Sequence, residues 1–130
     1  MTEVASELPI GIAEAARNWR EVLLTGNLSA DRRVDVVSRW LLMTRAAVFP
    51  MTLVSGAIGG LLALGHPEAN AGLFALALLG LLAAHAANNL MNDYFDLAGG
   101  VDTENYPRAL YAPHPVLSGM VSRTGLAVRA

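Results

Sequence analysis

Amides and carboxylates crowd together at the end of the second of two long apolar runs in this chain. Residues 89–102 read NLMNDYFDLAGGVD. An Asp at the centre of a membrane helix costs about 2.5–3.5 kcal/mol on insertion scales. Acidic residues that are kept next to lipid despite this cost usually bind a cation or move protons. The segment therefore predicts a chemical site, and its oxygen ligands favour Mg²⁺ together with a diphosphate group.

Helical geometry brings the polar side chains of this segment to one face. At 1.5 Å per residue, a helix over 72–98 would be about 40 Å long, which exceeds a hydrocarbon core of about 30 Å. Its last two turns must then emerge from the membrane or line a wet cavity. Asn92 and Asp96 stack one turn apart, and Gly99-Gly100 ends the helix so that Asp102 can return toward them. Five polar residues share about a 100° arc of this helix: His85, Asn89, Asn92, Asp93 and Asp96.

The ligand types favour magnesium over zinc. Mg²⁺ is usually held by one or two carboxylates plus substrate phosphates, and Asn92, Asp96 and Asp102 offer one amide carbonyl and two carboxylates. The chain has no Cys, so thiol ligands and disulfides are excluded. The alternative is a set of solvated, capping polar residues where a helix leaves the membrane. His85, deeper in the helix, is interpreted as a hydrogen-bonded interior histidine rather than a base, and no catalytic residue is assigned.

The elements that must position this cluster are two apolar runs. The chain is 54% hydrophobic and 15% charged, with a mean hydropathy of +0.42. Residues 46–67 and 69–92 carry no charge, and about 20 apolar residues suffice to cross a bilayer. We therefore expect an integral membrane protein with spans at about 46–66 and 71–92; the alternative is a buried hairpin in a soluble protein. The net charge of −2 gives no basic footprint for nucleic acid.

Small residues and arginines add packing and orientation. Gly56 and Gly60 form a GxxxG pair, which lets helices approach closely in lipid, and Pro50 lies at the start of the first span. The turn between the runs has no arginine, so the positive-inside rule places both chain ends and the acidic cluster in the cytoplasm, with the spans in the cell membrane. Arginines lie on both sides of the hairpin, among them Arg32, Arg33, Arg39 and Arg45 before it, and Arg108, Arg123 and Arg129 after it.

Residues 1–44 form a separate amphipathic region. Ile12, Ala16, Trp19 and Leu23 recur at helical spacing and predict the apolar face of a first helix, which Gly26-Asn27 ends. A second helix is expected to follow, with Ser29 as its cap, an apolar line of Val34, Val37 and Leu41, and Arg39 and Trp40 at the headgroup level. The region is interpreted either as a surface-lying lead into the membrane or as a soluble extension packed on cytoplasmic loops.

The acidic segment also resembles a known motif. Residues 92–96, followed by Gly100-Val101-Asp102, resemble the first Asp-rich motif of the UbiA superfamily of intramembrane prenyltransferases. The closing acid, Asp102, lies six residues after Asp96, a spacing similar to that of the menaquinone-pathway branch. Many other members place this acid two residues earlier, where this chain has Gly100.

The similarity extends to both sides of the motif and covers roughly Trp40 to Gly119. Arg108 and residues 113–119 resemble the loop that follows the motif, while Arg45 and Pro50 match the family's entry into its first membrane helix. Residues 45–130 are thus expected to be the N-terminal part of a prenyltransferase domain, with an Asp-rich loop at 92–119.

The resemblance implies an all-α fold of nine membrane helices and a magnesium-dependent enzyme. Such an enzyme transfers a polyprenyl group from an allylic diphosphate to an aromatic acceptor, here 1,4-dihydroxy-2-naphthoate in menaquinone biosynthesis. Asn92, Asp96 and Asp102 would then bind Mg²⁺, while Asn89, Asp93 and Arg108 would contact the substrate. Family members carry a second Asp-rich motif later, so we expect this chain to be an N-terminal fragment, inactive alone. The alternative is a non-catalytic two-span membrane protein that acts through helix partners.

Overall fold

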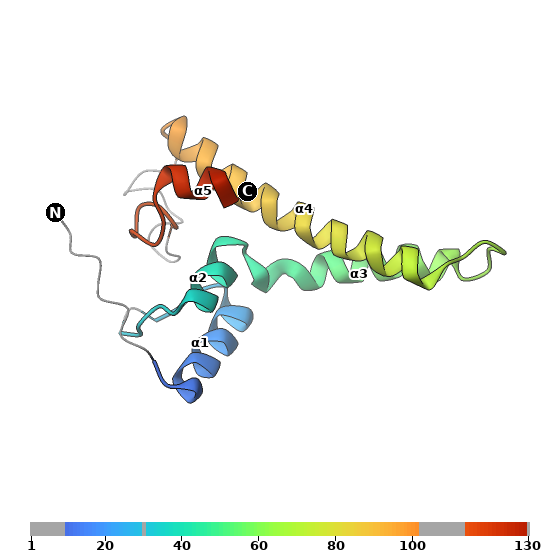
Figure 1. The fold of residues 1–130 in the computed structure, drawn as a ribbon, viewed down its shortest axis with the longest axis horizontal. Helices are drawn as coiled ribbons and strands as arrows, with labels where there is room; N and C mark the ends of the chain where they lie inside the picture. The colour runs from blue at the N-terminus through green and yellow to red at the C-terminus, as the bar shows by residue number, and fades with distance from the viewer. Residues whose placement is uncertain (1–9, 30, 102–113, 130) are drawn as a thin grey trace.

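Every regular element of the described chain is a helix. The computed structural model describes residues 10–29, 31–101 and 114–129. Helices α3 and α4 form a long hairpin that extends to one side, and α1, α2 and α5 gather at its other end (Figure 1). The predicted all-α class is confirmed for these residues. The elements are α1 (Ile12–Thr25), α2 (Val36–Met43), the 3₁₀ helix η1 (Ala46–Val48), α3 (Phe49–Ala63), α4 (Ala71–Ala98) and α5 (Arg123–Arg129).

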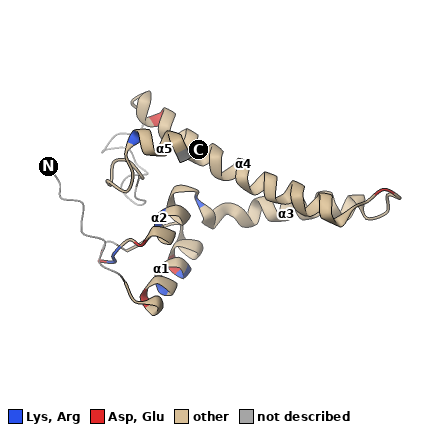
Figure 2. Cartoon of the chain, in the orientation of Figure 1, with Lys and Arg blue, Asp and Glu red and all other residues tan. Residues whose placement is uncertain are grey.

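Both arms of the hairpin are long and apolar enough to cross a membrane. Residues 46–63 have a mean hydropathy of 1.8 over 18 residues, and the most apolar 18-residue stretch of the 28-residue helix α4 reaches 1.7. Only 6% of the first apolar window and none of the second is buried inside the protein, whereas a core helix of a soluble protein would be mostly buried. Figure 2 shows charged residues at the base of the hairpin and at its turn, with uncharged helix between them.

The helix boundaries refine the predicted spans. The first arm ends at Ala63 rather than near residue 66, because the turn into α4 begins earlier. The second begins at Ala71, as predicted, where the Asn70 side chain accepts a hydrogen bond from the Leu73 amide at 3.0 Å. The start of the predicted Asp-rich segment 92–119 lies on α4, which stays helical to Ala98, in agreement with the helix expected over 72–98.

The GxxxG pair brings the two arms together. A Cβ atom added at Gly56 would lie 2.5 Å from Leu78 Cδ1, and one added at Gly60 would lie 2.6 Å from the Phe74 ring. A side chain at either position would force Leu78 or Phe74 to move, so the two glycines allow these side chains of α4 to pack directly on α3. The predicted close packing is confirmed, and α4 is the partner.

The first helix ends where expected but buries a different face. Gly26 adopts a left-handed conformation with φ of 70°, and its amide donates to the Val22 carbonyl at 2.8 Å. The predicted apolar face was wrong, since Ile12 is 87% exposed and Ala16 and Leu23 are also exposed. The residues that are buried each precede a predicted face residue by one position, so the buried face is rotated by about 100° from the predicted one. It includes the polar residue Asn18, which an apolar pattern does not reveal. The buried residues are Ala15, Asn18 and Val22.

The second helix is capped by Asp35 rather than by Ser29. The Asp35 carboxylate accepts hydrogen bonds from the Val37 and Ser38 amides, each at 3.0 Å, and so caps α2. It also accepts from the Trp19 indole at 2.8 Å, which joins α2 to α1. Ser29 instead donates hydrogen bonds from its amide and its hydroxyl to the Glu21 carboxylate. The residue predicted to cap α2 is therefore a loop residue that is bonded to α1.

The last helix closes the base of the hairpin. Leu126 of α5 is fully buried against Met43 of α2 and Leu90 of α4. The Arg123 guanidinium lies 5.0 Å from the centre of the Tyr94 ring, within the range of a cation–π contact. This packing covers one side of the part of α4 that carries the acidic segment, while Asn92 and Phe95 remain exposed.

Candidate metal and diphosphate site

The acidic segment occupies the last turns of one continuous helix. At 1.5 Å per residue, the 28 residues of α4 extend about 42 Å, beyond a hydrocarbon core of about 30 Å. The Gly99 amide donates to the Phe95 carbonyl at 2.7 Å, and Gly100 takes a left-handed φ of 71°. The predicted helix end at these glycines is confirmed.

The structure divides the predicted cluster into two pairs. Asn89 and Asp93 are buried, with 6% and 0% of their surface exposed. Asn92 is exposed and Asp96 is half-buried. Each pair is spaced by one helical turn, and the two pairs lie on neighbouring strips of the same face.

The buried pair holds the bend between α2 and α3. We call residues 44–45 the elbow. Asn89 Nδ2 donates to the Thr44 carbonyl at 2.9 Å, and the Arg45 guanidinium pairs with the Asp93 carboxylate. Arg45 is the one non-glycine residue with positive φ in the described chain, at 54°. A left-handed conformation costs an L-residue about 1–2 kcal/mol, so the elbow needs such contacts to stay in place.

The outer pair is open. Within the described ranges, neither Asn92 nor Asp96 makes a side-chain hydrogen bond or ion pair. The same ranges hold no group of three His, Cys, Asp or Glu side chains that could bind a metal ion. Asn92 and Asp96 therefore offer one amide and one carboxylate, which fits a Mg²⁺ ion that takes its other ligands from water and phosphate.

Two predicted site residues cannot be placed. Asp102, the third predicted metal ligand, and Arg108, the predicted diphosphate contact, lie outside the described residues. The sequence interpretation did not assign Arg45 to the acidic segment. The sequence did contain an indication of this pairing. An acid next to lipid usually pairs with a cation, and Arg45 is the arginine nearest the first span.

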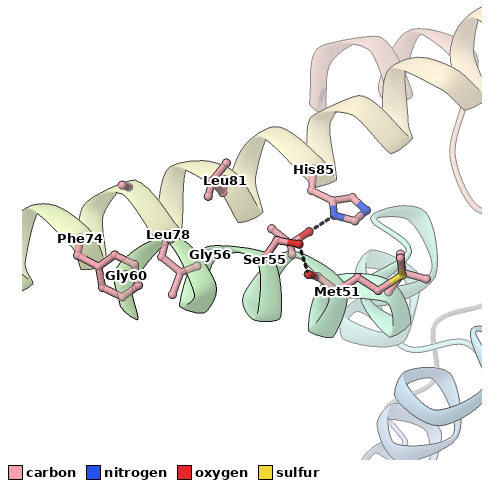
Figure 3. Close-up of a pocket in the computed structure, with 12 residues that line it drawn as sticks. Met51, Ser55, Gly56, Gly60, Phe74, Leu78, Leu81 and His85 are labelled. Atoms are coloured by element: carbon pink, nitrogen blue, oxygen red, sulfur yellow. Dashed lines mark hydrogen bonds between the residues drawn. The ribbon is translucent and has the colours of Figure 1, made fainter. Parts of the chain in front are cut away.

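His85 lies away from the acidic segment, in a groove between the two arms. Its Nδ1 is 2.5 Å from the Thr52 hydroxyl, and its ring meets Phe49 edge-on at 5.4 Å between ring centres. The interpretation of His85 as a hydrogen-bonded interior residue is confirmed. The groove has a volume of about 740 Å³ and is lined mostly by apolar side chains and glycines from α3 and α4 (Figure 3).

Comparisons of the chain with protein families, with known proteins and with solved structures give no match. Its function is therefore inferred from its residues and their geometry.

Proposed function

We propose that this chain forms the first part of an intramembrane prenyltransferase domain of the UbiA kind. The reaction would transfer a polyprenyl group from an allylic diphosphate to an aromatic acceptor, 1,4-dihydroxy-2-naphthoate in menaquinone biosynthesis. The main support is the open pair Asn92 and Asp96, one turn apart, at the end of a helix that is long and apolar enough to span a membrane.

The open pair would provide the cation-binding side of the site. Asp96 would give a carboxylate oxygen and Asn92 an amide oxygen, with Asp102 as a third ligand and Arg108 as a fork-shaped donor to diphosphate oxygens. When bound, Mg²⁺ neutralises charge on the departing diphosphate as a Lewis acid. The apolar faces of α3 and α4 would exclude water from the prenyl chain, which protects a reactive allylic group.

We further propose that the hairpin crosses the cell membrane with both chain ends in the cytoplasm. The arginines on both sides of the hairpin, and their absence from its turn, support this orientation. Reporter fusions after residue 68 and after residue 120 are expected to report opposite sides of the membrane. Both reporters on one side would contradict the hairpin.

The proposed site can be tested by metal binding. Mn²⁺ takes the same oxygen ligands as Mg²⁺, and its electron paramagnetic resonance signal reports coordination. The purified chain in detergent micelles is expected to bind Mn²⁺ more tightly when farnesyl diphosphate is present. Asp96→Asn should weaken this binding, and Glu68→Gln, an acid at the far turn, serves as the matched control. Equal Mn²⁺ binding by all three proteins would refute the site.

The chain alone is expected to show no prenyl transfer. It offers two apolar helices and one Asp-rich segment, which cannot enclose a polyprenyl chain together with an aromatic ring. Purified chain, free of any full-length enzyme, should give no product with farnesyl diphosphate, 1,4-dihydroxy-2-naphthoate and Mg²⁺. Magnesium-dependent product in this assay would contradict the expectation.

A second candidate is a non-catalytic protein that acts through helix partners in the membrane. It is favoured by small residues of α3 along the open groove between the two arms, where a Cβ atom added at Gly59 would meet nothing within 4 Å and Ser55 is exposed. Small residues at this spacing allow another helix to approach. Diphosphate-dependent Mn²⁺ binding that is lost in Asp96→Asn would separate the enzyme from this alternative.

A further inference from the structure

The elbow joins three parts of the molecule. It connects α2 to the membrane helix α3 through η1, and η1 in turn contacts the end of α1, since a Cβ atom added at Gly26 would lie 3.7 Å from the Ala47 side chain. Met43, the last residue of α2, packs on Leu90 of α4. The direction of the elbow therefore sets how the α1–α2 pair meets the acidic end of α4, as the ribbon shows at the base of the hairpin (Figure 1).

Two side chains from α4 hold this bend at adjacent residues. Asn89 donates to the carbonyl of Thr44 at 2.9 Å, and Asp93 pairs with the side chain of Arg45, which has the left-handed backbone. Asn89 and Asp93 are one turn apart, so both contacts come from a single strip of α4. Two contacts one turn apart on a helix oppose both its rotation and its sliding relative to the elbow.

This attachment determines where the open pair points. Asn92 and Asp96 lie on the neighbouring strip of the same rigid helix, so the rotation of α4 sets the direction of both side chains. We propose that Asn89 and Asp93 are positioning residues, which fasten α4 to the elbow and thereby aim Asn92 and Asp96 at the metal and diphosphate. This inference rests on the proposed function for its ligand, and on the elbow contacts for its geometry.

Spin-label distances test the attachment without any ligand. The chain has no Cys, so a cysteine pair can be introduced at Val36 of α2 and Leu76 of α4, both exposed. The labelled protein is expected to give one narrow distance distribution. Asp93→Asn, which leaves the Arg45 charge unpaired, should broaden it, whereas Asp96→Asn should leave it narrow. An unchanged distribution in Asp93→Asn would overturn the positioning role.

Mn²⁺ binding with diphosphate tests whether Asp93 acts through Arg45. Loss of a residue that orients metal ligands typically lowers metal affinity about 10–100-fold, and Asp93→Asn should fall in this range. The double variant Arg45→Gly/Asp93→Asn removes both charges and places glycine where φ is positive. If Asp93 acts only through Arg45, the double variant should give a distance distribution as broad, and a Mn²⁺ affinity as low, as Arg45→Gly alone.

The outcomes separate this inference from the proposed function. If the double variant binds Mn²⁺ clearly more weakly than Arg45→Gly alone, Asp93 is itself a ligand and the positioning role is wrong. If the unsubstituted chain binds no Mn²⁺ with diphosphate, the proposed function fails at this site, while the distance measurement still decides whether Asn89 and Asp93 hold the elbow.

Discussion

Asp96→Asn is expected to lower prenyl-transfer turnover by roughly a hundredfold or more in a full-length prenyltransferase that contains this segment. The substitution keeps the size and the helical position of the side chain but removes one negative charge from the metal site. Metal stabilisation of a departing phosphate is worth several kcal/mol, and each 1.4 kcal/mol or so is tenfold in rate. Turnover measured across a Mg²⁺ titration should recover only partly at high Mg²⁺.

Two companion variants make the result specific. Asp93→Asn should cause a smaller loss, because its side chain is rotated about 60° from Asp96 around the helix and pairs with Arg45. Glu68→Gln, at the far turn of the hairpin, should keep normal turnover. Near-normal turnover of Asp96→Asn at limiting Mg²⁺ would mean that Asp96 is not a metal ligand and that the polar residues serve only to end the helix.

Local chemistry made the hairpin predictable. Three local features carry the prediction, and each affects only one helix or two adjacent ones. They are the runs of uncharged residues, the glycine pair at Gly56 and Gly60, and the glycines after Ala98. The sequence therefore predicted two long apolar helices, their close approach and the end of α4. The membrane position of these helices, the third ligand at Asp102 and the role of Arg108 stay predictions.

Contacts between distant residues account for the errors. Asp35 caps α2, where Ser29 was expected, because the same carboxylate also accepts from Trp19, sixteen residues away. A prediction of helix caps from sequence considers only the residues next to a helix and cannot include such a distant contact. The contacts of Asn89 and Asp93 with the elbow, 45 and 48 residues earlier in the chain, were likewise not predicted, because no helical periodicity encodes them. Their roles in substrate binding stay predictions.

Asp35 connects α1 to α2 through more hydrogen bonds than a simple cap. Besides the Val37 and Ser38 amides and the Trp19 indole, its carboxylate accepts from the Ser38 hydroxyl at 2.5 Å and from Asn18 Nδ2 at 3.4 Å. Asn18 and Ser38 are both fully buried. Removal of the carboxylate would therefore uncap a helix and leave buried polar groups with fewer partners.

Asp35→Ala is expected to destabilise the α1–α2 pair by roughly 3 kcal/mol. A lost N-cap costs about 0.5–2 kcal/mol, and a buried polar group left without its partner costs about 1–3 kcal/mol more. This corresponds to an increase of about a hundredfold in the opening equilibrium, measurable as faster hydrogen exchange of the α2 amides. Asp31→Asn, an exposed acid in the same loop, should change exchange little, and slow exchange in Asp35→Ala would contradict the assigned role.

The same contacts make the helix pair sensitive to acid. Burial alone would raise the pKa of Asp35, but hydrogen bonds from Ser38, Trp19 and Asn18 outweigh it and hold the pKa below the ordinary Asp value of 3.8. A carboxyl with a lowered pKa in the folded state stabilises the fold above its unfolded pKa and loses that contribution as the pH falls through the folded pKa. Exchange of the α2 amides, corrected for intrinsic rates, should therefore accelerate below about pH 4.

Asp35→Asn keeps one acceptor oxygen for the cap but cannot titrate, so its α2 amides should exchange faster at neutral pH and show no further acceleration in acid. An acid response of equal size in Asp35→Asn would place the titrating group elsewhere.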